Sequence, residues 1–270
     1  MISRTNNTTS TAHKLYTSKI IKAGALLADT KTMLAHWDEA LSVPENLTRF
    51  RRENIFGKAS RSRIEDMLAI FRQRYLASQS VTKALITLVQ GKLSNEVLDR
   101  ILYFHAAQAD VLLHDIVTEV LARFPTIGKV DVVPEDIRAA IMNWIAEGRM
   151  IRAWSENTLV RATRELLSTL RDFGILQGAV NKRLAPIYLP VEAFAYVAFY
   201  LQQRQPSGER LLDDPEWQLF FLSRHAVERF FLEAHQHHLL EYRAAGSIIR
   251  ITFPATSIEE YAYALAQRAH

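Results

Sequence analysis

The stretch "SENTLVRATRELLSTLRDFGIL", residues 155–176, decides how the second half of the chain is interpreted. Ser155 can accept a hydrogen bond from the first free backbone N–H groups, so a helix is predicted to begin after it. Leu and Phe side chains recur along one face, and Gly174 predicts the helix end. The opposite face is polar at helical spacing, and it carries Asn157, Arg161, Arg164, Ser168 and Arg171.

This polar face suits two kinds of helix. Arg and Asn side chains on a helix can contact bases and phosphates in a DNA groove, but arginine is also common on surface helices that bind nothing. The flanking sequence favours DNA, because a short helix between Pro134 and Gly148 precedes the stretch and β-like sequence follows it. A helix followed by a hairpin is the order of a winged helix-turn-helix. We therefore predict DNA contacts, the last two at the tip of the hairpin, for Asn157, Thr158, Arg161, Arg164, Arg171, Lys182 and Arg183.

Composition excludes several classes of protein. The chain has 270 residues, 49% of them hydrophobic, and no cysteine. The missing cysteine excludes a disulfide framework and zinc fingers, and it fits a reducing cytoplasm. Residues 1–14 are polar, so we predict no signal peptide. The uncharged run at 193–203 is far shorter than the roughly 20 apolar residues of a membrane span, and we expect a cytoplasmic protein without a membrane partner.

Charge is unevenly distributed along the chain. Residues 49–74 carry eight basic and three acidic residues, and residues 149–183 carry seven and three. The segments 75–148 and 209–270 each carry six basic and nine acidic residues. Because phosphate binding depends on local positive potential, this clustering matters more than the total charge of +4.

The remaining periodicity is mainly helical. It predicts one helix from Thr17 or Ser18 to about His36, and a long one that is capped by Ser94 or Asn95 and stops before Pro125. "TIGKVDVV", after Pro125, is the clearest linker. The predicted fold class is mainly α. An N-terminal helical domain, with a possible helix-turn-helix, occupies 1–130, and a winged-helix-like region with short β-hairpin wings occupies 131–270.

An internal repeat favours one or two winged units in the second region. Ser155 and Ser223, 68 residues apart, each precede a helix, a short apolar exit and β-like sequence that ends at a proline. The sequence "HLLEYRAAGSIIRITF", which follows the second helix, alternates around Ala-Gly and predicts a hairpin.

Another basic cluster precedes the opening stretch in the chain, and we name it the first basic cluster. It spans a helix end, a turn at Gly57 and a new helix start after Ser60, a spacing that also resembles a helix-turn-helix. DNA contact and a solvated surface explain this cluster equally well. Its candidate DNA-binding residues are Arg49, Arg51, Arg52, Lys58, Arg61 and Arg63.

The sequence offers little for metal, cofactor or catalytic chemistry. "GKAS", residues 57–60, lacks the first glycine of a phosphate loop and has Ala59 after the lysine. His235, His237 and His238 do not share one helix face, and no carboxylate stands at ligand spacing. No nucleophile elbow or paired-carboxylate signature is present. We expect no metal, no cofactor and no enzymatic activity.

The N-terminal third resembles the BrxA family of bacteriophage-exclusion (BREX) defence systems. The resemblance lies in "YTSKIIKAGALLADTKTMLAHWDE" and "NIFGKASRSRIEDMLAIFRQRYL", and it continues through the region of the opening stretch. It implies an all-α, cytoplasmic, non-enzymatic protein with helix-turn-helix elements that binds double-stranded DNA. It also implies partners among the BREX methyltransferase, ATPase and phosphatase-like components.

Residues and resemblance together predict a double-stranded DNA-binding component of a BREX system that contacts mainly the phosphate backbone. The alternative is a protein-interaction scaffold without DNA contact, in which the acidic segments 75–148 and 209–270 dock other components of the defence complex.

Overall fold

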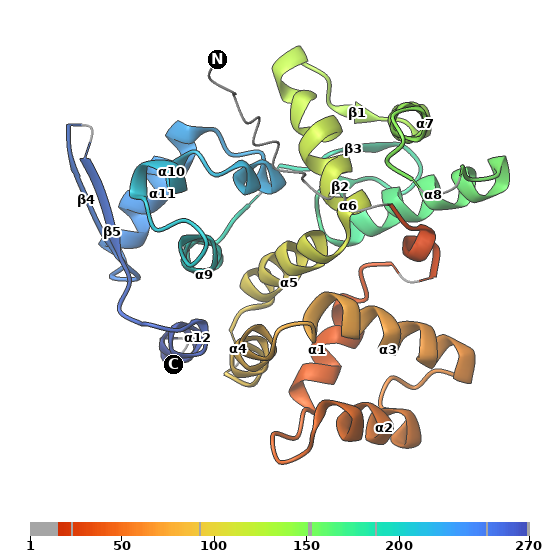
Figure 1. Ribbon diagram of the computed structural model, residues 1–270, viewed down its shortest axis with the longest axis horizontal. Coiled ribbons are helices and arrows are strands. Elements are labelled where there is room, and N and C mark those ends of the chain that lie inside the picture. Colours follow the sequence, from red (N-terminus) through yellow and green to blue (C-terminus); the bar gives the residue numbers. More distant parts are fainter. Residues whose placement is uncertain are drawn as a thin grey trace, which may run out of the picture.

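The computed structural model describes residues 16–22, 24–91, 93–150, 153–186, 188–246 and 248–268. The sequence predictions for residues 1–14 therefore lie outside the described residues. Within the described ranges the chain forms twelve α-helices, short 3-10 and π segments and five short strands (Figure 1). The predicted mainly-α class is confirmed. None of the helices in these ranges is long and apolar enough to cross a membrane.

The first third folds into short helices that begin at serine caps. After the 3-10 helix η1 (Ser18–Lys22), the helices are α1 (Leu27–Ala35), α2 (Val43–Glu53), α3 (Arg61–Tyr75) and α4 (Gln79–Gln90). The side chains of Ser42, Ser60 and Ser78 each accept a hydrogen bond from the backbone N–H three residues later. A side-chain cap satisfies one of the free donors at a helix start, which is why these boundaries follow the sequence.

The single helix predicted up to about His36 is wrong. η1 and α1 are separate elements, and Leu26 between them has a left-handed backbone with φ of 54°. The buried Arg74 of α3 donates to the carbonyl of Gly24 at 2.8 Å. This tertiary hydrogen bond satisfies a carbonyl that a continuous helix would have used internally.

The long helix predicted before Pro125 is also interrupted. α5 (Asn95–Ala109) ends at Asp110, whose backbone is extended and whose carboxylate accepts from the N–H of Leu113 at 3.2 Å. Asp110 is thereby the N-terminal cap of the next helix. The elements that follow are α6 (Val111–Asp115), the π-helical turn η2 (Ile116–Val120), and the 3-10 turns η3 (Leu121–Arg123) and η4 (Pro125–Ile127).

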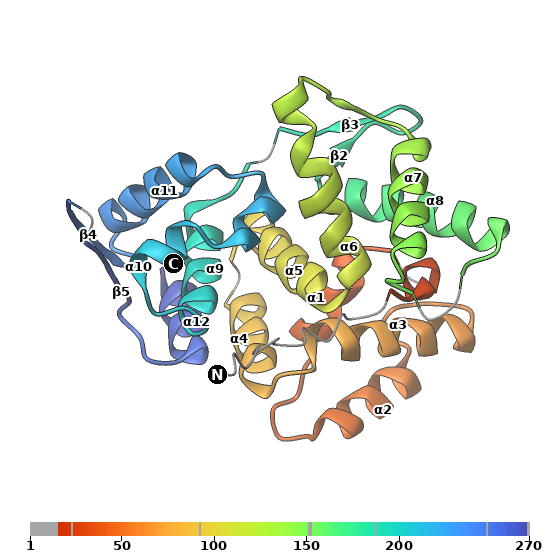
Figure 2. The same cartoon turned by 45° about the horizontal axis from the view of Figure 1, so that its top comes forward.

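Two helices and a small sheet come next. The elements are β1 (Asp131–Val132), α7 (Pro134–Ala146), α8 (Glu156–Asp172), β2 (Leu176–Gln177) and β3 (Lys182–Leu184). β3 is the central strand and pairs antiparallel with both β1 and β2. The sheet therefore ties the segment before α7 to the hairpin after α8 (Figure 2).

The last part repeats the helix-then-hairpin order. It contains α9 (Val191–Gln202), α10 (Gly208–Leu212), the 3-10 helix η5 (Pro215–Phe220), α11 (Arg224–Gln236), the paired strands β4 (Glu241–Ala245) and β5 (Ile248–Thr252), and α12 (Ile258–Gln267). The predicted hairpin is confirmed, and α9 is buried along most of its length.

One apolar core continues through the whole molecule. α12, near the end of the chain, packs against α4 from its first third and against α9. At the end of α4, a Cβ on Gly91 would lie 2.5 Å from the Cβ of Ala266, so this close approach of α12 requires glycine. The predicted boundary at 130/131 falls between η4 and β1, and buried side chains on both sides of it share this core. The division into two domains stays a prediction.

Candidate nucleic-acid interface

α8 is fixed firmly at both ends. At its start, Ser155 Oγ accepts from the N–H of Thr158 at 3.3 Å, as predicted. At its end, Arg100 of α5 donates to the carbonyl of Phe173 at 2.8 Å, which places a cation at the negative end of the helix dipole. Leu166 and Leu170 are fully buried between these ends, so the opposite face is held in one orientation.

The polar face of α8 is exposed, as the helical spacing predicted. Asn157, Arg161, Arg164 and Arg171 are exposed, and Ser168 is half-buried. Arg164 lies 3.7 Å from the carboxylate of Glu165, and Arg171 lies 2.7 Å from that of Asp172. Arg161 forms no ion pair with any described residue. Exposed ion pairs contribute about 0–1 kcal/mol, so an anion can readily compete for these arginines.

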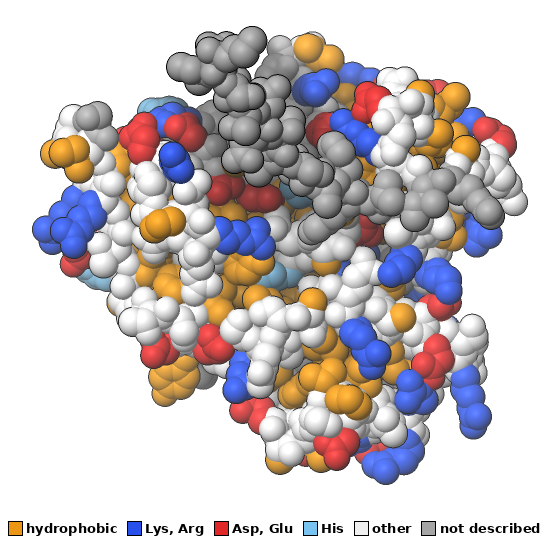
Figure 3. All heavy atoms as spheres, viewed as in Figure 1, with side chains coloured by type: hydrophobic (Ala, Val, Ile, Leu, Met, Phe, Trp, Pro, Cys, Tyr) orange, Lys and Arg blue, Asp and Glu red, His pale blue; other side chains and the backbone are white. Residues whose placement is uncertain are grey.

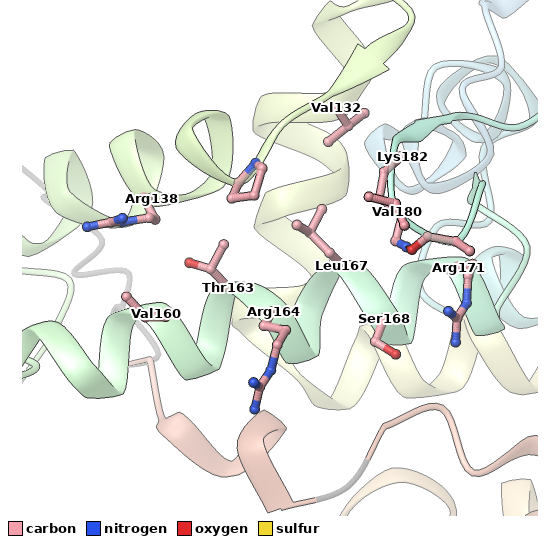
Figure 4. Close-up of a pocket in the computed structure, with 12 residues that line it drawn as sticks. Val132, Arg138, Val160, Thr163, Arg164, Leu167, Ser168, Arg171, Val180 and Lys182 are labelled. Atoms are coloured by element: carbon pink, nitrogen blue, oxygen red, sulfur yellow. The ribbon is translucent and has the colours of Figure 1, made fainter.

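A groove runs beside this face, with a volume of about 440 Å³. It lies between the start of α7, one flank of α8 and the turn that joins β2 to β3 (Figure 4). Arg164 and Arg171 extend from α8 in the same direction in this view. The lining is apolar at Val132, Pro134, Val160, Leu167, Ala179 and Val180, and basic at Arg138, Arg164, Arg171 and Lys182.

Thr163 adds an unpartnered hydroxyl to the groove. Its side chain lines the groove, is 2% exposed, and has no hydrogen-bond partner for Oγ1 among the described residues. A buried hydroxyl without a partner costs about 1–3 kcal/mol. The Thr163 hydroxyl could therefore donate a hydrogen bond to a ligand oxygen that enters the groove. Thr163 was not predicted from the sequence, because a threonine on the buried side of a helix is typical of a packing residue.

Lys182 and Arg183 lie at the start of β3 and not at the tip of the hairpin, which corrects their predicted position. Lys182 Nζ folds back onto the carbonyl of Gly178 at 2.8 Å and onto that of Ala179. Arg183 pairs with Asp131 across the β1–β3 ladder at 3.1 Å and stays 56% exposed. The tip itself is apolar, because Val180 is 90% exposed.

Most of the first basic cluster, on α2 and α3, is engaged within the protein. Arg49 donates to the carbonyl of His36 and lies over the Phe50 ring. Arg51 binds Glu65, with one N–O distance of 2.9 Å. Arg51 thereby joins α2 to α3, and both arginines, candidate DNA-binding residues in the sequence, are used within the protein.

The remaining residues of this cluster differ in how free they are. Lys58 pairs with Asp29 at 3.0 Å, and Arg63 donates to the carbonyl of Lys22. Arg52 is 74% exposed, with only its neighbour Glu53 as a partner, and Arg61 is exposed without an ion pair among the described residues. Figure 3 shows basic side chains gathered over α2 and α3.

The short helix η1 lies between the two basic regions. It packs against α8, while Lys22 at its end pairs with Asp66 of α3 at 3.0 Å. Gly24 follows it, and a Cβ there would lie 3.6 Å from the Thr169 hydroxyl of α8. The exposed face of α8 and the α2–α3 turn are therefore held in a fixed relation through this segment.

The histidines show no metal-ligand arrangement within the described ranges. No group of three His, Asp or Glu side chains there could hold a metal ion. The carbonyls of His237 and His238 accept hydrogen bonds from Arg268 at 2.7 and 2.6 Å. His105 is buried against the Tyr196 hydroxyl, and burial lowers its pKa to about 3.

A polar network that the sequence analysis missed connects distant segments. His114 of α6 lies between the carboxylates of Asp115, at 2.8 Å, and Glu216 of η5, at 3.2 Å. Tyr16 donates to Asp115 at 2.6 Å, and Arg149 binds Glu119 at 2.9 Å. These partners are up to 102 residues apart in sequence, so helical periodicity gives no signal for them.

Comparison with known proteins gives one family and one fold. A family model described as BrxA matches residues 14–200. No curated protein matches the chain. A solved structure described as the crystal structure of an uncharacterized protein from Magnetospirillum magneticum is similar, with a TM-score of 0.58 and 15% sequence identity. The match covers 70% of this chain and 94% of that chain; at this identity it shows a shared fold alone.

Proposed function

The chain belongs to the BrxA family, and on that premise we propose that it binds double-stranded DNA through α8 and the hairpin that follows it. The membership makes the chain a component of a BREX phage-defence system. The resemblance noted in the sequence is thereby confirmed. DNA is a natural ligand for such a component, and a cytoplasmic location, where phage DNA is accessible, is part of the proposal.

The order of elements from β1 to β3 supports a winged helix-turn-helix. In such a unit two helices meet at a turn, the second one enters the major groove, and a hairpin follows as the wing. Here α7 and α8 pack together, and β2 and β3 follow α8 directly. β1, which precedes α7, pairs with β3 and holds the hairpin beside α8. We assign α8 as the recognition helix and β2–β3 as the wing.

The contacts of α8 would be mainly with phosphates. Arg161, Arg164 and Arg171 share the exposed face, and a guanidinium binds phosphate oxygens with two parallel hydrogen bonds. Asn157, in the first turn, is placed to reach a base edge. The apolar lining of the neighbouring groove fits deoxyribose, and the exposed Arg164 and Arg171 at its edge fit the flanking phosphates.

We further propose that the chain acts without catalysis, metal or cofactor. Its partners in this proposal are the other BREX proteins, among them methyltransferase, ATPase and phosphatase-like components. In the scaffold alternative, the acidic segments 75–148 and 209–270 would dock these partners.

The observation that carries the proposal is the exposed arginine face on a helix fixed at both ends. Its test is a mobility-shift titration of the purified protein against two unrelated duplexes, in chelator and at several salt concentrations. Binding with a log–log salt slope of roughly −3 to −5 is expected for a handful of phosphate contacts, at about 0.9 per phosphate. No complex at low salt, together with retention of other BREX proteins on the immobilised chain, would instead establish the scaffold.

A further inference from the structure

The β4–β5 hairpin carries two arginines that face each other. The register places Arg243 directly opposite Arg250, with Glu241 opposite Thr252 on the same face. Tyr242 and Ile251 point to the other face and are buried. The hairpin therefore packs one face on the protein and presents both arginines on the outward face.

A like-charged pair in this position is unfavourable for the free protein. Directly opposite Cβ atoms in an antiparallel ladder are about 4.5–5.5 Å apart, and like charges there destabilise the pairing. Glu241, two residues along the strand, lies 3.2 Å from Arg243 and relieves one of the charges. Arg250 is exposed and forms no ion pair with any described residue.

The pair is not a by-product of a basic segment. Residues 209–270 have six basic and nine acidic residues, so carboxylates are plentiful nearby. Arg224, on the adjacent helix α11, binds Glu209 at 2.6 Å and also Asp213. The same unit thus neutralises one arginine twice and leaves the opposed pair on the hairpin with a single carboxylate.

We infer that the outward face of β4–β5 is a second phosphate-binding surface for duplex DNA, an inference that rests on the proposed function. Two guanidinium groups side by side on an antiparallel ladder can each bind one of two consecutive phosphates of a DNA strand. Each guanidinium would donate charge-assisted hydrogen bonds to the phosphate oxygens. Ile248, 73% exposed beside the turn, adds an apolar side chain to the same face.

This surface is separate from α8. Figures 1 and 2 both place the hairpin at the opposite end of the molecule from α8, and Figure 3 shows basic side chains gathered at the outer edge, over the hairpin. Effects of changes at sites that share no partners are additive in free energy. The losses of DNA affinity from changes at the two surfaces should therefore multiply.

The test compares three variants of the full chain by fluorescence anisotropy with a 40-base-pair duplex. The hairpin variant is Arg243→Gln with Arg250→Gln, and the α8 variant is Arg161→Ala with Arg164→Ala. The matched control, Arg72→Gln with Lys83→Gln, also removes two exposed positive charges, from α3 and α4. Thermal unfolding of each variant checks that the fold is kept.

The hairpin variant is expected to lose roughly tenfold in affinity at 0.1 M salt, with a salt slope shallower by about 1.8. The control should match the parent, and the combined hairpin and α8 variant should show the product of the two losses. A hairpin variant with the parent's affinity and slope overturns this inference while the proposed function stands. A parent that binds no duplex overturns both.

Discussion

The two helix–hairpin units, α8 with β2–β3 and α11 with β4–β5, share their order but distribute positive charge differently. Their capping serines, Ser155 and Ser223, are 68 residues apart, and each accepts a backbone hydrogen bond at 3.3 Å. In the first unit the exposed arginines lie on the helix, and Lys182 of the hairpin is folded back onto its own turn. In the second unit Arg224 of α11 is held by two carboxylates, Arg229 of the same helix is exposed, and the hairpin carries the opposed pair Arg243 and Arg250.

The comparison shows that element order and ligand contact are set by different residues. Apolar spacing and serine caps are common to both units, and they determine where helices begin and which face is buried. Charge on the exposed faces is not constrained by the fold, because exposed ion pairs contribute little to stability. Each unit can therefore present its positive charge on a different element while keeping the same architecture.

The substitution with the largest expected effect on the free energy of unfolding tests whether the two units unfold together. Phe231 of α11 is fully buried, and its ring stacks with Tyr242 of β4 at 5.8 Å between centroids. Phe231→Ala should lower the free energy of unfolding by about 3–5 kcal/mol. Because one core spans the chain, urea unfolding followed by circular dichroism should stay a single transition, as it should for Leu166→Ala in α8. Two separated transitions would instead support the domain boundary predicted at 130/131.

The two hairpin turns provide the next comparison. Gly178, in the first turn, has φ of 95°, and a Cβ there would lie 2.0 Å from the carbonyl oxygen of Asn181. Gly246, in the second turn, has φ of 59° and open space around its Cβ position. Gly178→Ala should cost about 3 kcal/mol, from the left-handed backbone and the clash together, and Gly246→Ala about 1–2 kcal/mol. The melting temperatures of the two variants measure these losses of stability. Equal decreases in melting temperature would contradict the conclusion that the first turn is the more tightly packed one.

The contact between α6 and η5, outside the two units, should depend on pH. Burial lowers the pKa of His114, but hydrogen bonds with Asp115 and Glu216 outweigh burial and raise it to about 9. Since this value lies above the unfolded value of about 6.5, the stabilisation is complete below pH 6.5 and is lost as the pH rises to about 9. The loss should be about 1–2 kcal/mol, measured by urea unfolding at pH 6 and pH 9. The variant His114→Gln should flatten this dependence, and an unchanged dependence in the variant would refute the assignment.

Local sequence predicted most of the frame. Ser60, Ser94, Ser155 and Ser223 cap helices as expected, and the polar face of α8 is exposed as its spacing indicated. These features depend on neighbours within one or two helical turns, so they are visible in a single sequence. The helix breaks at Leu26 and Asp110 were not predicted, because apolar spacing continues across both.

The features that could not be predicted from the sequence depend on contacts between residues far apart in the chain. Arg74 satisfies the carbonyl of Gly24 from a helix 50 residues away, and Arg49 and Lys58 are used within the protein. A count of basic residues therefore overestimated the first cluster, on α2 and α3. The opposed arginine pair on β4–β5 needed the strand register, which only the structure provides.

The most direct test of the central claim is the salt dependence of duplex binding by two variants that each lose two exposed arginines. One variant is Arg161→Ala with Arg164→Ala on α8, and the other is Arg52→Ala with Arg61→Ala in the first cluster. Exposed arginines add little to stability, so both variants should melt near the parent temperature. If α8 contacts phosphates, the slope should become shallower by about 1.8 in the α8 variant alone, at about 0.9 per phosphate lost. An α8 variant that binds like the parent, beside a first-cluster variant that fails, would show that α8 is an ordinary solvated helix.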